Sequence, residues 1–431
     1  MTTEIEIKFI AKPSTVAGLS HQLNTWLLSQ TPGVRLTNIY FETEDHQLRR
    51  WDMGLRIRGE GEHYEMTLKT AGETVGGLHQ RPEFNVPLTR PELDLAQFPA
   101  GVWPADTRVE QLQQQLHPLF TTHFVREKWL VKYGNSEIEV ACDQGEISAG
   151  ERRELLHEIE LELKTGDRDD LLALAAALAT AGGVRLGSFS KAARGYALSN
   201  DQVVPAKRDL PVVVVSRKAS VEEGLQAALL TGLRHWQYGE ERWLRGQAAA
   251  REEMKQALSF LQQIFSLFGG IVPRKASSDL RAALHTLYEQ LNDEKQSAEL
   301  LCYTALSVTT QLALTNWIIH QRWREQVNDK GKQQLHGSFK RFSDIMLGRI
   351  GAGLKTTFTA VPDVQHYQDK QQRLQQQLLA VRIVAGAYPQ ADVSAWLDGW
   401  QHLAAAIETQ QQRTIDSVCQ QAMRQVAFWK Q

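Results

Sequence analysis

The chain has 431 residues, a length that favours two or three domains, because single hydrophobic cores stop growing near ~250–300 residues. Hydrophobic residues make up 42% and charged residues 23%, as in ordinary globular proteins, and the formal net charge is -2. This balance excludes a uniformly basic nucleic-acid binder, so no sequence-specific nucleic acid is expected as a partner. Any anion site must therefore come from local charge placement.

The first residues, Met1–Glu6, do not have the basic-then-apolar pattern of a signal peptide. A run of about 18 apolar residues, the length of a membrane span, is not found in the sequence. The three cysteines are far apart and odd in number, which disfavours a disulfide framework. These features predict a cytoplasmic protein that does not enter a membrane.

The first 200 residues contain many short segments of alternating polar and apolar residues, the pattern of β-strands. A helix is predicted after Pro13, with Ser14 as its N-cap, running towards Leu28. A second is predicted to open at Asp167 and to stop at Gly182-Gly183. This half therefore reads as an α+β domain with an antiparallel sheet. The predicted strands are Glu4–Ile10, Gly54–Arg58, His63–Thr70, Arg81–Val86, Phe124–Val131, Glu137–Asp143 and Leu156–Leu163.

The sequence changes character near Ser199. Prolines and charged residues punctuate 201–218, which is predicted to be a linker. Ser220-Val-Glu-Glu223 then forms a capping-box pattern ahead of a helix. From there to Gln431 the chain has helical periodicity and is rich in Leu, Ala and Gln. We expect a domain at 1–200, the linker at 201–218, and an all-α helical bundle at 219–431.

Carboxylates gather on strands at the two ends of the first domain. Alternation places Glu4, Glu6 and Lys8 on one face of the first strand, with Ile5, Ile7 and Phe9 on the other. The late strands repeat this pattern. Their acidic positions are Glu139, Asp143, Glu158, Glu160 and Glu162.

Basic residues occupy the strands between these acidic ones. An amphipathic sheet with one face in water would explain any single strand. A solvated face, however, gains most from opposite charges placed across from each other, whereas like charges here are segregated by strand. If the sheet closes into a barrel, the acidic strands become neighbours, which a bound cation would make tolerable. The basic positions on these strands are Arg56, Arg58, Lys69, Arg81, Arg126 and Lys128, and Lys191 and Arg194 follow the last acidic strand.

Segregated carboxylates and arginines suit a polyphosphate bound with a hard metal ion. Carboxylate oxygens are typical ligands of Mg²⁺ or Mn²⁺, and substrate phosphates complete the coordination. Arg and Lys neutralise phosphate oxygens. Hydrolysis then needs charge stabilisation and a water placed in line with the leaving group. No G-x-x-x-x-G-K-[ST] loop is present, which disfavours a P-loop mechanism.

Glu4-Ile-Glu6-Ile-Lys8 resembles the E-x-E-x-K signature of the CYTH family, the triphosphate tunnel metalloenzymes. The resemblance continues in order through Arg81-x-Glu83 and ends at Ser190-Lys191. It implies a closed eight-stranded antiparallel β-barrel with flanking helices, whose interior is the active-site tunnel. It also implies water activation by a second metal ion.

The same resemblance implies roles for individual residues. The catalytic set would be Glu4, Glu6 and Lys8. Triphosphate would be bound by Lys8, Arg56, Arg58, Lys69, Arg81, Arg126, Lys128 and Lys191. Mg²⁺ or Mn²⁺ would be held by Glu4, Glu6, Asp143, Glu158, Glu160 and Glu162.

The helical half is similar to a CHAD domain, a module often joined to CYTH, in the stretches Phe268–Lys275 and Ser338–Phe342. This resemblance implies longer polyphosphate as a further partner. There is one departure from the pattern. Many CHAD domains carry a dense arginine ladder on their first helices, whereas Glu252–Phe268 has Lys255 followed by glutamines and a serine.

The preferred prediction is metal-dependent hydrolysis of inorganic triphosphate to pyrophosphate and phosphate. A thiamine or nucleoside triphosphatase, or an enzyme like the class IV adenylyl cyclases, would use the same barrel with a pocket for the organic group. A non-catalytic polyphosphate-binding protein is a third reading. The series of carboxylates argues against it, because a pure anion binder has no reason to place them beside its phosphate site.

Overall fold

A computed structural model describes residues 2–409 and 412–430. The chain forms two compact units. The first, called here the barrel unit, comprises the residues up to Ala206 together with Glu241–Gln247 and Ser297–Asn316. The second, the helical unit, comprises Lys207–Glu240, Ala248–Gln296 and the residues from Trp317 onwards. The predicted domain boundaries at 200 and 218 remain a prediction.

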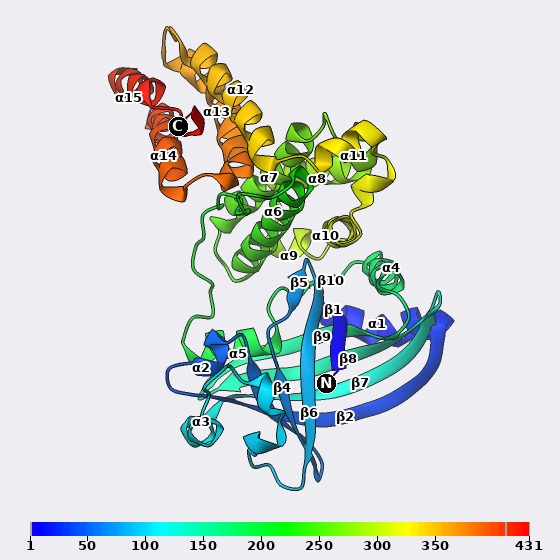
Figure 1. Cartoon of the computed structure of the whole chain (residues 1–431). Coiled ribbons are helices and arrows are strands. Elements are labelled where there is room, and N and C mark those ends of the chain that lie inside the picture. Colours follow the sequence, from blue (N-terminus) through cyan, green and yellow to red (C-terminus); the bar gives the residue numbers. More distant parts are fainter. Residues whose placement is uncertain (1, 410–411, 431) are drawn as a thin grey trace. The chain divides into compact units, whose positions relative to one another are not determined.

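The barrel unit is built on one antiparallel sheet that closes on itself (Figure 1). Strand neighbours run β1-β9-β8-β7-β2-β3-β4-β6, and β6 pairs back with β1, so eight strands complete the ring. β10 and β5 pair with β1 and β6 respectively. The predicted closed eight-stranded barrel is therefore confirmed. The strands are β1 (Thr2–Ala11), β2 (Leu27–Glu42), β3 (Gly54–Glu60), β4 (His63–Lys69), β5 (Glu73–Val75), β6 (Leu78–Leu88), β7 (His117–Tyr133), β8 (Ser136–Ala149), β9 (Arg152–Thr165) and β10 (Val184–Leu186).

Closure makes neighbours of the first and last long strands of the barrel, as the charge pattern predicted. Six of the seven predicted strands lie wholly within observed ones, and His63–Thr70 exceeds β4 by one residue. The observed strands are longer than predicted, because cross-strand pairing extends them into segments without clear alternation. β7 and β8, for example, stay paired from Thr121↔Ser148 to Tyr133↔Ser136.

The predicted extent of the first helix was wrong. α1 spans Pro13–Leu23, with Lys12 as N-cap and no side-chain cap from Ser14. Proline suits the first helical position, because a backbone N–H there would have no acceptor within the helix, so nothing is lost when proline has none. From Leu27 the chain is strand β2, which pairs with β7 from Leu27↔Val131 to Glu42↔His117. Tertiary pairing thus overrides the local helical pattern.

Short helices flank the barrel. The helix predicted from Asp167 is confirmed as α4, and Gly182 and Gly183 follow it at φ of 70° and 77°, which glycine adopts without strain. Apolar side chains on the outer face, such as Ile7 and Phe9, are fully buried. The α-helices of this unit are α2 (Gln47–Arg50), α3 (Val109–Gln115), α4 (Arg168–Ala179), α5 (Lys191–Ser199), α9 (Ala298–Leu301) and most of α10 (Ala305–Ile319).

The helical unit confirms the predicted all-α character of the second half. Ser220 and Glu223 form the predicted capping box: Ser220 N donates to Glu223 Oε2 at 2.7 Å, and Glu223 N donates to Ser220 Oγ at 3.2 Å. No helix among the described residues is both long and apolar enough to cross a membrane. The helices are α6 (Val221–Leu244, whose last turn belongs to the barrel unit), α7 (Ala250–Leu267), α8 (Ser278–Asn292), α11 (Asp329–Leu335), α12 (Phe339–Phe358), α13 (Val364–Val384), α14 (Gln390–Thr409) and α15 (Gln412–Arg424).

Candidate active site

Alternate residues of the barrel strands face its interior. In antiparallel pairing, directly opposed residues share one face of the sheet. Lys8 lies opposite Glu160, and ion pairs that skip a strand, such as Lys69 on β4 with Glu4 on β1, identify this face as the interior. The ionisable residues on it are Glu4, Glu6, Lys8, Arg56, Arg58, Glu65, Lys69, His79, Arg81, Glu83, Arg126, Lys128, Glu139, Asp143, Glu154, Glu158, Glu160 and Glu162.

Glu4 carries negative charge that its neighbours do not fully balance. Its carboxylate pairs with Lys69. Burial, together with the nearby charges of Glu6 and Glu83, nevertheless raises the pKa of Glu4 to about 7. A bound cation would reverse this shift, because it would favour the ionised carboxylate.

Lys8 joins the carboxylates of β1 and β9. Its Nζ lies 3.4 Å from Glu6 Oε1 and 3.1 Å from Glu160 Oε1. Burial works against ionisation of Glu6, but Lys8 and other nearby cations lower its pKa below the usual value. The predicted catalytic trio, Glu4, Glu6 and Lys8, therefore lies together on the interior face of β1.

Lys191 enters the interior from helix α5, whose N-cap Ser190 accepts a hydrogen bond from Ala193 N. Its Nζ lies 2.8 Å from Asp143 Oδ2, 2.5 Å from Glu158 Oε2 and 2.8 Å from Glu160 Oε1. Asp143, Glu158 and Glu160 also form a group whose oxygens are close enough to share a metal ion. In this structure the Lys191 ammonium lies among the three carboxylates and balances part of their negative charge.

Arg126 completes this cluster from β7. Its Nε and Nη2 donate to the two carboxylate oxygens of Asp143, both at 2.6 Å, and Nη2 also donates to Glu160 Oε2 at 2.6 Å. Asp143 is fully buried, and two-point pairing of this kind fixes a guanidinium firmly. Asp143 is thus neutralised by protein cations alone.

The opposite wall of the barrel is cationic. Arg58 Nε donates to the neutral side chain of Asn38 at 3.1 Å. Burial, and repulsion from Arg56 and Arg126, lower the pKa of Arg58 to about 10. Arg56 Nε and the facing Thr67 Oγ1 are buried and have no hydrogen-bond partner among the described residues. This wall therefore offers the positive charge of Arg58, whose hydrogen-bond partner Asn38 is neutral, and two buried polar groups, Arg56 Nε and Thr67 Oγ1, without a partner in the described part of the chain.

Three predicted residues lie at the margins of this arrangement. Lys128 is 37% exposed and pairs with Glu139 at 3.2 Å. Arg81 is 35% exposed and reaches Asp52 at 3.3 Å. Glu162 pairs with Lys164 at 2.9 Å. All three face the barrel interior, but their present partners draw them away from the Lys191 cluster.

Several interior residues were missing from the predicted site. Glu83 pairs with Lys69 at 3.3 Å, and Tyr40 accepts a hydrogen bond from Arg56 Nη1 at 3.4 Å. Thr67 and Asn38 are uncharged, so a search for segregated charge passes over them. Glu83 belongs to the motif Arg81-x-Glu83, and its position two residues from Arg81 on the same strand could have predicted that it faces the interior.

Helix α5 packs against β7, β8 and β9 with its apolar side chains. The Tyr196 ring meets Phe120 edge-on at a centroid distance of 5.4 Å, and Phe120 stacks on Tyr40 at 4.5 Å. Tyr196 OH also donates to the fully buried Glu42 at 2.6 Å. These contacts fix the helix that carries Lys191.

The fold and site together define a closed antiparallel barrel whose interior is lined by opposed clusters of carboxylates and cationic side chains. Models of two known protein families match this chain. Residues 2–196 match the CYTH domain, and residues 227–419 match the CHAD domain. The chain therefore contains a CYTH domain followed by a CHAD domain.

A curated relative is the inorganic triphosphatase of Haemophilus influenzae, which is 40% identical over 203 residues. The match covers 47% of this chain and 56% of the relative, so this chain spans little more than half of that protein's length. Among solved structures, HpAC1 from Hippeastrum is described as having a dominant triphosphatase activity. It is 18% identical, covering 48% of this chain and all of its own, with a TM-score of 0.34. The CHAD domain of Ricinus communis is 16% identical, covering 51% of this chain and 89% of its own, with a TM-score of 0.30.

Proposed function

We propose that the barrel binds inorganic triphosphate together with a divalent cation and hydrolyses it to pyrophosphate and phosphate. One observation carries the proposal. The same interior holds unbalanced negative charge at Glu4 and unbalanced positive charge at Arg58. A metal–triphosphate complex brings both missing charges at once, because its cation suits the first and its phosphate oxygens suit the second.

The residues fit Mg²⁺ or Mn²⁺ as the cation. The donors around Glu4 are carboxylate oxygens, which these hard ions prefer. Asp143 and Glu158 are fully buried, whereas the side chain of Glu160, which also pairs with Lys191, is 14% exposed, so we assign the metal to the remaining predicted ligands. These are Glu4, Glu6, Glu160 and Glu162. A bound divalent ion supplies positive charge to phosphoryl oxygens and activates a water for attack.

The cationic wall would bind the triphosphate. Phosphate oxygens would accept hydrogen bonds from Arg56 Nε and Thr67 Oγ1, the buried groups that lack a partner. The Arg58 guanidinium would gain the anion that its neutral partner Asn38 does not provide. Lys8, whose Nζ pairs with both Glu6 and Glu160, would hold the terminal phosphate near these two carboxylates.

The reaction then needs little covalent work from the protein. Water attacks the terminal phosphorus, the bridging P–O bond breaks, and pyrophosphate leaves with the bonding electrons. The fixed cations neutralise charge that develops on the bridging and terminal oxygens. Before substrate arrives, Lys8 is held by ion pairs with Glu6 and Glu160, and Arg58 by its hydrogen bond to Asn38, so little reorganisation is required at the moment of reaction.

A phosphate-release assay tests the proposal. Purified full-length protein is given tripolyphosphate, ATP or thiamine triphosphate at equal concentration, with Mg²⁺, Mn²⁺ or EDTA. We expect metal-dependent release that is fastest with tripolyphosphate. Faster turnover of ATP or thiamine triphosphate would move the assignment to an organic triphosphate. Binding of long-chain polyphosphate without turnover under either metal would make the protein a polyphosphate binder, a role that stays a prediction for the helical unit.

A further inference from the structure

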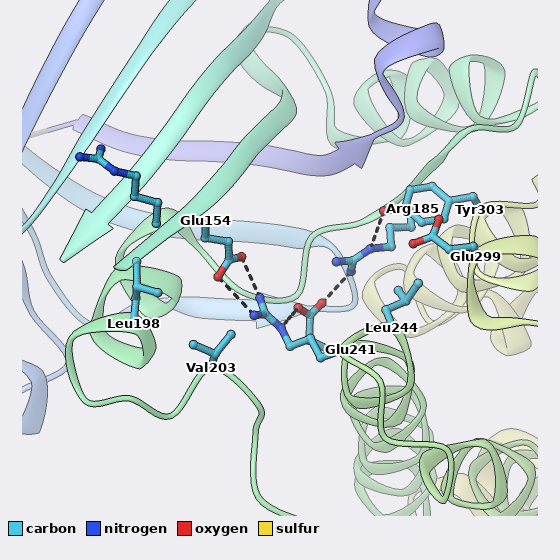
Figure 2. A pocket seen from close by; sticks show the side chains of 10 residues that line it. Glu154, Arg185, Leu198, Val203, Glu241, Leu244, Glu299 and Tyr303 are labelled. Atoms are coloured by element: carbon cyan, nitrogen blue, oxygen red, sulfur yellow. Dashed lines mark hydrogen bonds and ion pairs between the residues drawn. The ribbon is translucent and has the colours of Figure 1, made fainter. Parts of the chain in front are cut away.

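A chain of ion pairs leads from the barrel interior to a pocket within the barrel unit. Figure 2 shows the residues that line this pocket. The pocket is lined by charged side chains, among them Arg153, Glu154, Arg185, Glu241 and Arg245. None of these residues belongs to the proposed substrate or metal site. The dashed lines in Figure 2 follow the pairs that join Glu154, Glu241 and Arg185.

The chain begins at Arg194, one turn after Lys191 on α5. Its Nη1 donates to Glu158 Oε1 at 2.8 Å, and its Nε donates to Glu154 Oε1 at 2.7 Å. Glu158 is the fully buried carboxylate that also binds Lys191. Arg194, itself 4% exposed, therefore links the Lys191 cluster to Glu154.

Glu154 is shared with a second arginine. Arg245 Nη2 donates to Glu154 Oε1 at 3.0 Å and Nη1 to Oε2 at 3.2 Å. Arg245 Nε also donates to Glu241 Oε1 at 2.7 Å. Glu241 is 1% exposed, and its other oxygen lies 2.8 Å from Arg185 Nη1. Glu154, Arg245 and Glu241 thus each bridge two partners of opposite charge.

We propose that Glu154 and Arg245 are positioning residues for the barrel site, acting through Arg194 on Lys191 and thereby on Glu160. Arg194 must face Glu158 and Glu154 together, and these pairs add to the contacts of Tyr196 in fixing the rotation of α5 about its axis. That rotation sets the Lys191 ammonium among its three carboxylates. Without Arg245, Glu154 keeps only Arg194, and both side chains gain freedom.

The expected effect of Arg245 on Mg²⁺ affinity rests on the proposed function, whereas its expected effect on the order of α5 does not. Glu160 is a proposed metal ligand held by Lys191. Groups that orient metal ligands typically contribute about 10- to 100-fold to metal affinity or activity. Because Arg245 acts on Glu160 through three intermediate residues, Glu154, Arg194 and Lys191, we expect a loss of about tenfold in apparent Mg²⁺ affinity, the lower end of that range. KM for tripolyphosphate at saturating Mg²⁺ should change little.

The test compares Arg245→Met with a matched control, Arg153→Met. Arg153 lines the same pocket and loses the same charge, but its side chain is 60% exposed and pairs with Glu146. Hydrogen exchange of the α5 amides is measured first, in the full-length protein without metal or substrate. Arg245→Met should accelerate exchange by about tenfold or more, as expected for loss of charged hydrogen bonds, and Arg153→Met should not.

Activity measurements follow on the same proteins. Arg245→Met should shift the Mg²⁺ dependence, and Arg245→Lys should recover part of the shift because an ammonium can still reach one carboxylate. Equal α5 exchange in wild type and Arg245→Met would overturn the proposal, as would an equal effect of the two methionine variants. If wild type releases no phosphate, the proposed function fails, while the exchange result still decides whether Arg245 positions α5.

Discussion

Lys69 on β4 forms an ion pair with Glu4 on β1 across the intervening strand β6, yet this pair does not bring the pKa of Glu4 back to the usual value of a carboxyl group. The pKa of Glu4 remains raised to about 7, because burial and the charges of Glu6 and Glu83 outweigh the ammonium. Glu4 is thus half-protonated near neutral pH. A cation that binds there must compete with a proton.

This competition predicts a pH-dependent metal affinity. As pH falls from 8 to 6, Glu4 takes up its proton, and we expect apparent Mg²⁺ affinity to fall by about tenfold per pH unit once the pH lies below 7, for one proton displaced. Glu4→Gln should bind Mg²⁺ weakly and lose this dependence. Titration of Mg²⁺ by calorimetry across that pH range, into wild type and Glu4→Gln, measures both effects.

The same shift has a consequence for stability. A carboxyl whose folded pKa of about 7 exceeds the usual 4.5 binds its proton more tightly in the folded state. Its contribution to stability is therefore fully present below pH 4.5 and is lost as pH rises through 7. Mg²⁺ should raise Tm more at pH 8 than at pH 6. An equal increase at both pH values would contradict the assignment of Glu4 as a ligand.

Removal of the Lys191 ammonium should destabilise the metal-free protein strongly. Lys191→Met leaves Asp143, Glu158 and Glu160 close together in a buried site, and breaking such a pair costs about 3–5 kcal/mol. Urea unfolding at pH 7 measures the loss. Lys132→Met, at an exposed lysine of β7, is the control and should stay within about 0.5 kcal/mol of wild type.

The sign of the pH dependence distinguishes this cause from simple loss of packing. In wild type, burial works against ionisation of Asp143 and Glu160, but nearby cations lower the pKa of both carboxyls below the usual value. The two carboxylates therefore stabilise the fold when the pH lies above their usual pKa, and this contribution is lost in acid. In Lys191→Met the carboxylates should take up protons at higher pH. The stability gap between variant and wild type should therefore narrow from pH 7 to pH 5. A constant gap would indicate packing alone.

Alternation of side chains was sufficient to predict seven of the strands, whereas closure into an eight-stranded barrel was implied by the resemblance to the CYTH family. Glu4, Glu6 and Lys8 were placed on one face because neighbouring positions are apolar, and the structure confirms that face. Strand β2 was missed, since Gln30-Thr-Pro-Gly33 resembles a loop and only pairing with β7 makes it a strand. Local pattern does not report such pairing.

Charge segregation identified residues of the site but not their partners. Glu158 and Arg194 are 36 positions apart, and Glu154 and Arg245 are 91 apart. The sequence alone does not show which arginine pairs with which carboxylate, because only the fold brings the partners together. The uncharged Thr67 could be found only from its place opposite Arg56.

Gly195 permits the close approach of α5 to β7. A β carbon at this position would overlap the ring of Phe120. Gly195→Ala should therefore displace α5, lower Tm and reduce triphosphate hydrolysis, at a cost of about 1–3 kcal/mol for overpacking. Gly18→Ala is the matched control, because nothing lies within 4 Å of its added methyl and helix α1 should gain about 0.5–1 kcal/mol. Thermal unfolding of both variants, with hydrolysis rates, tests the difference.

Arg58 should show a conflict between stability and function. Its charged form is disfavoured in the substrate-free barrel, because burial and repulsion from Arg56 and Arg126 lower its pKa to about 10. Arg58→Met removes that repulsion, so Tm should be unchanged or higher. The variant also loses a charged hydrogen bond to phosphate, worth about 1.5–3 kcal/mol, so KM for tripolyphosphate should rise about 10- to 150-fold.

Arg35→Met provides the comparison for Arg58→Met. Arg35 is exposed on β2 and lies on the opposite face from the interior residues Leu36 and Asn38. Its loss should leave both Tm and KM near the wild-type values, within the effect of about 0.5 kcal/mol usual for surface changes. A fall in Tm for Arg58→Met with an unchanged KM would mean that Arg58 supports the fold and not the anion. Stability is expected to be kept or gained while substrate affinity falls only if an anion binds at Arg58, so joint measurement of Tm and KM tests the cationic wall directly.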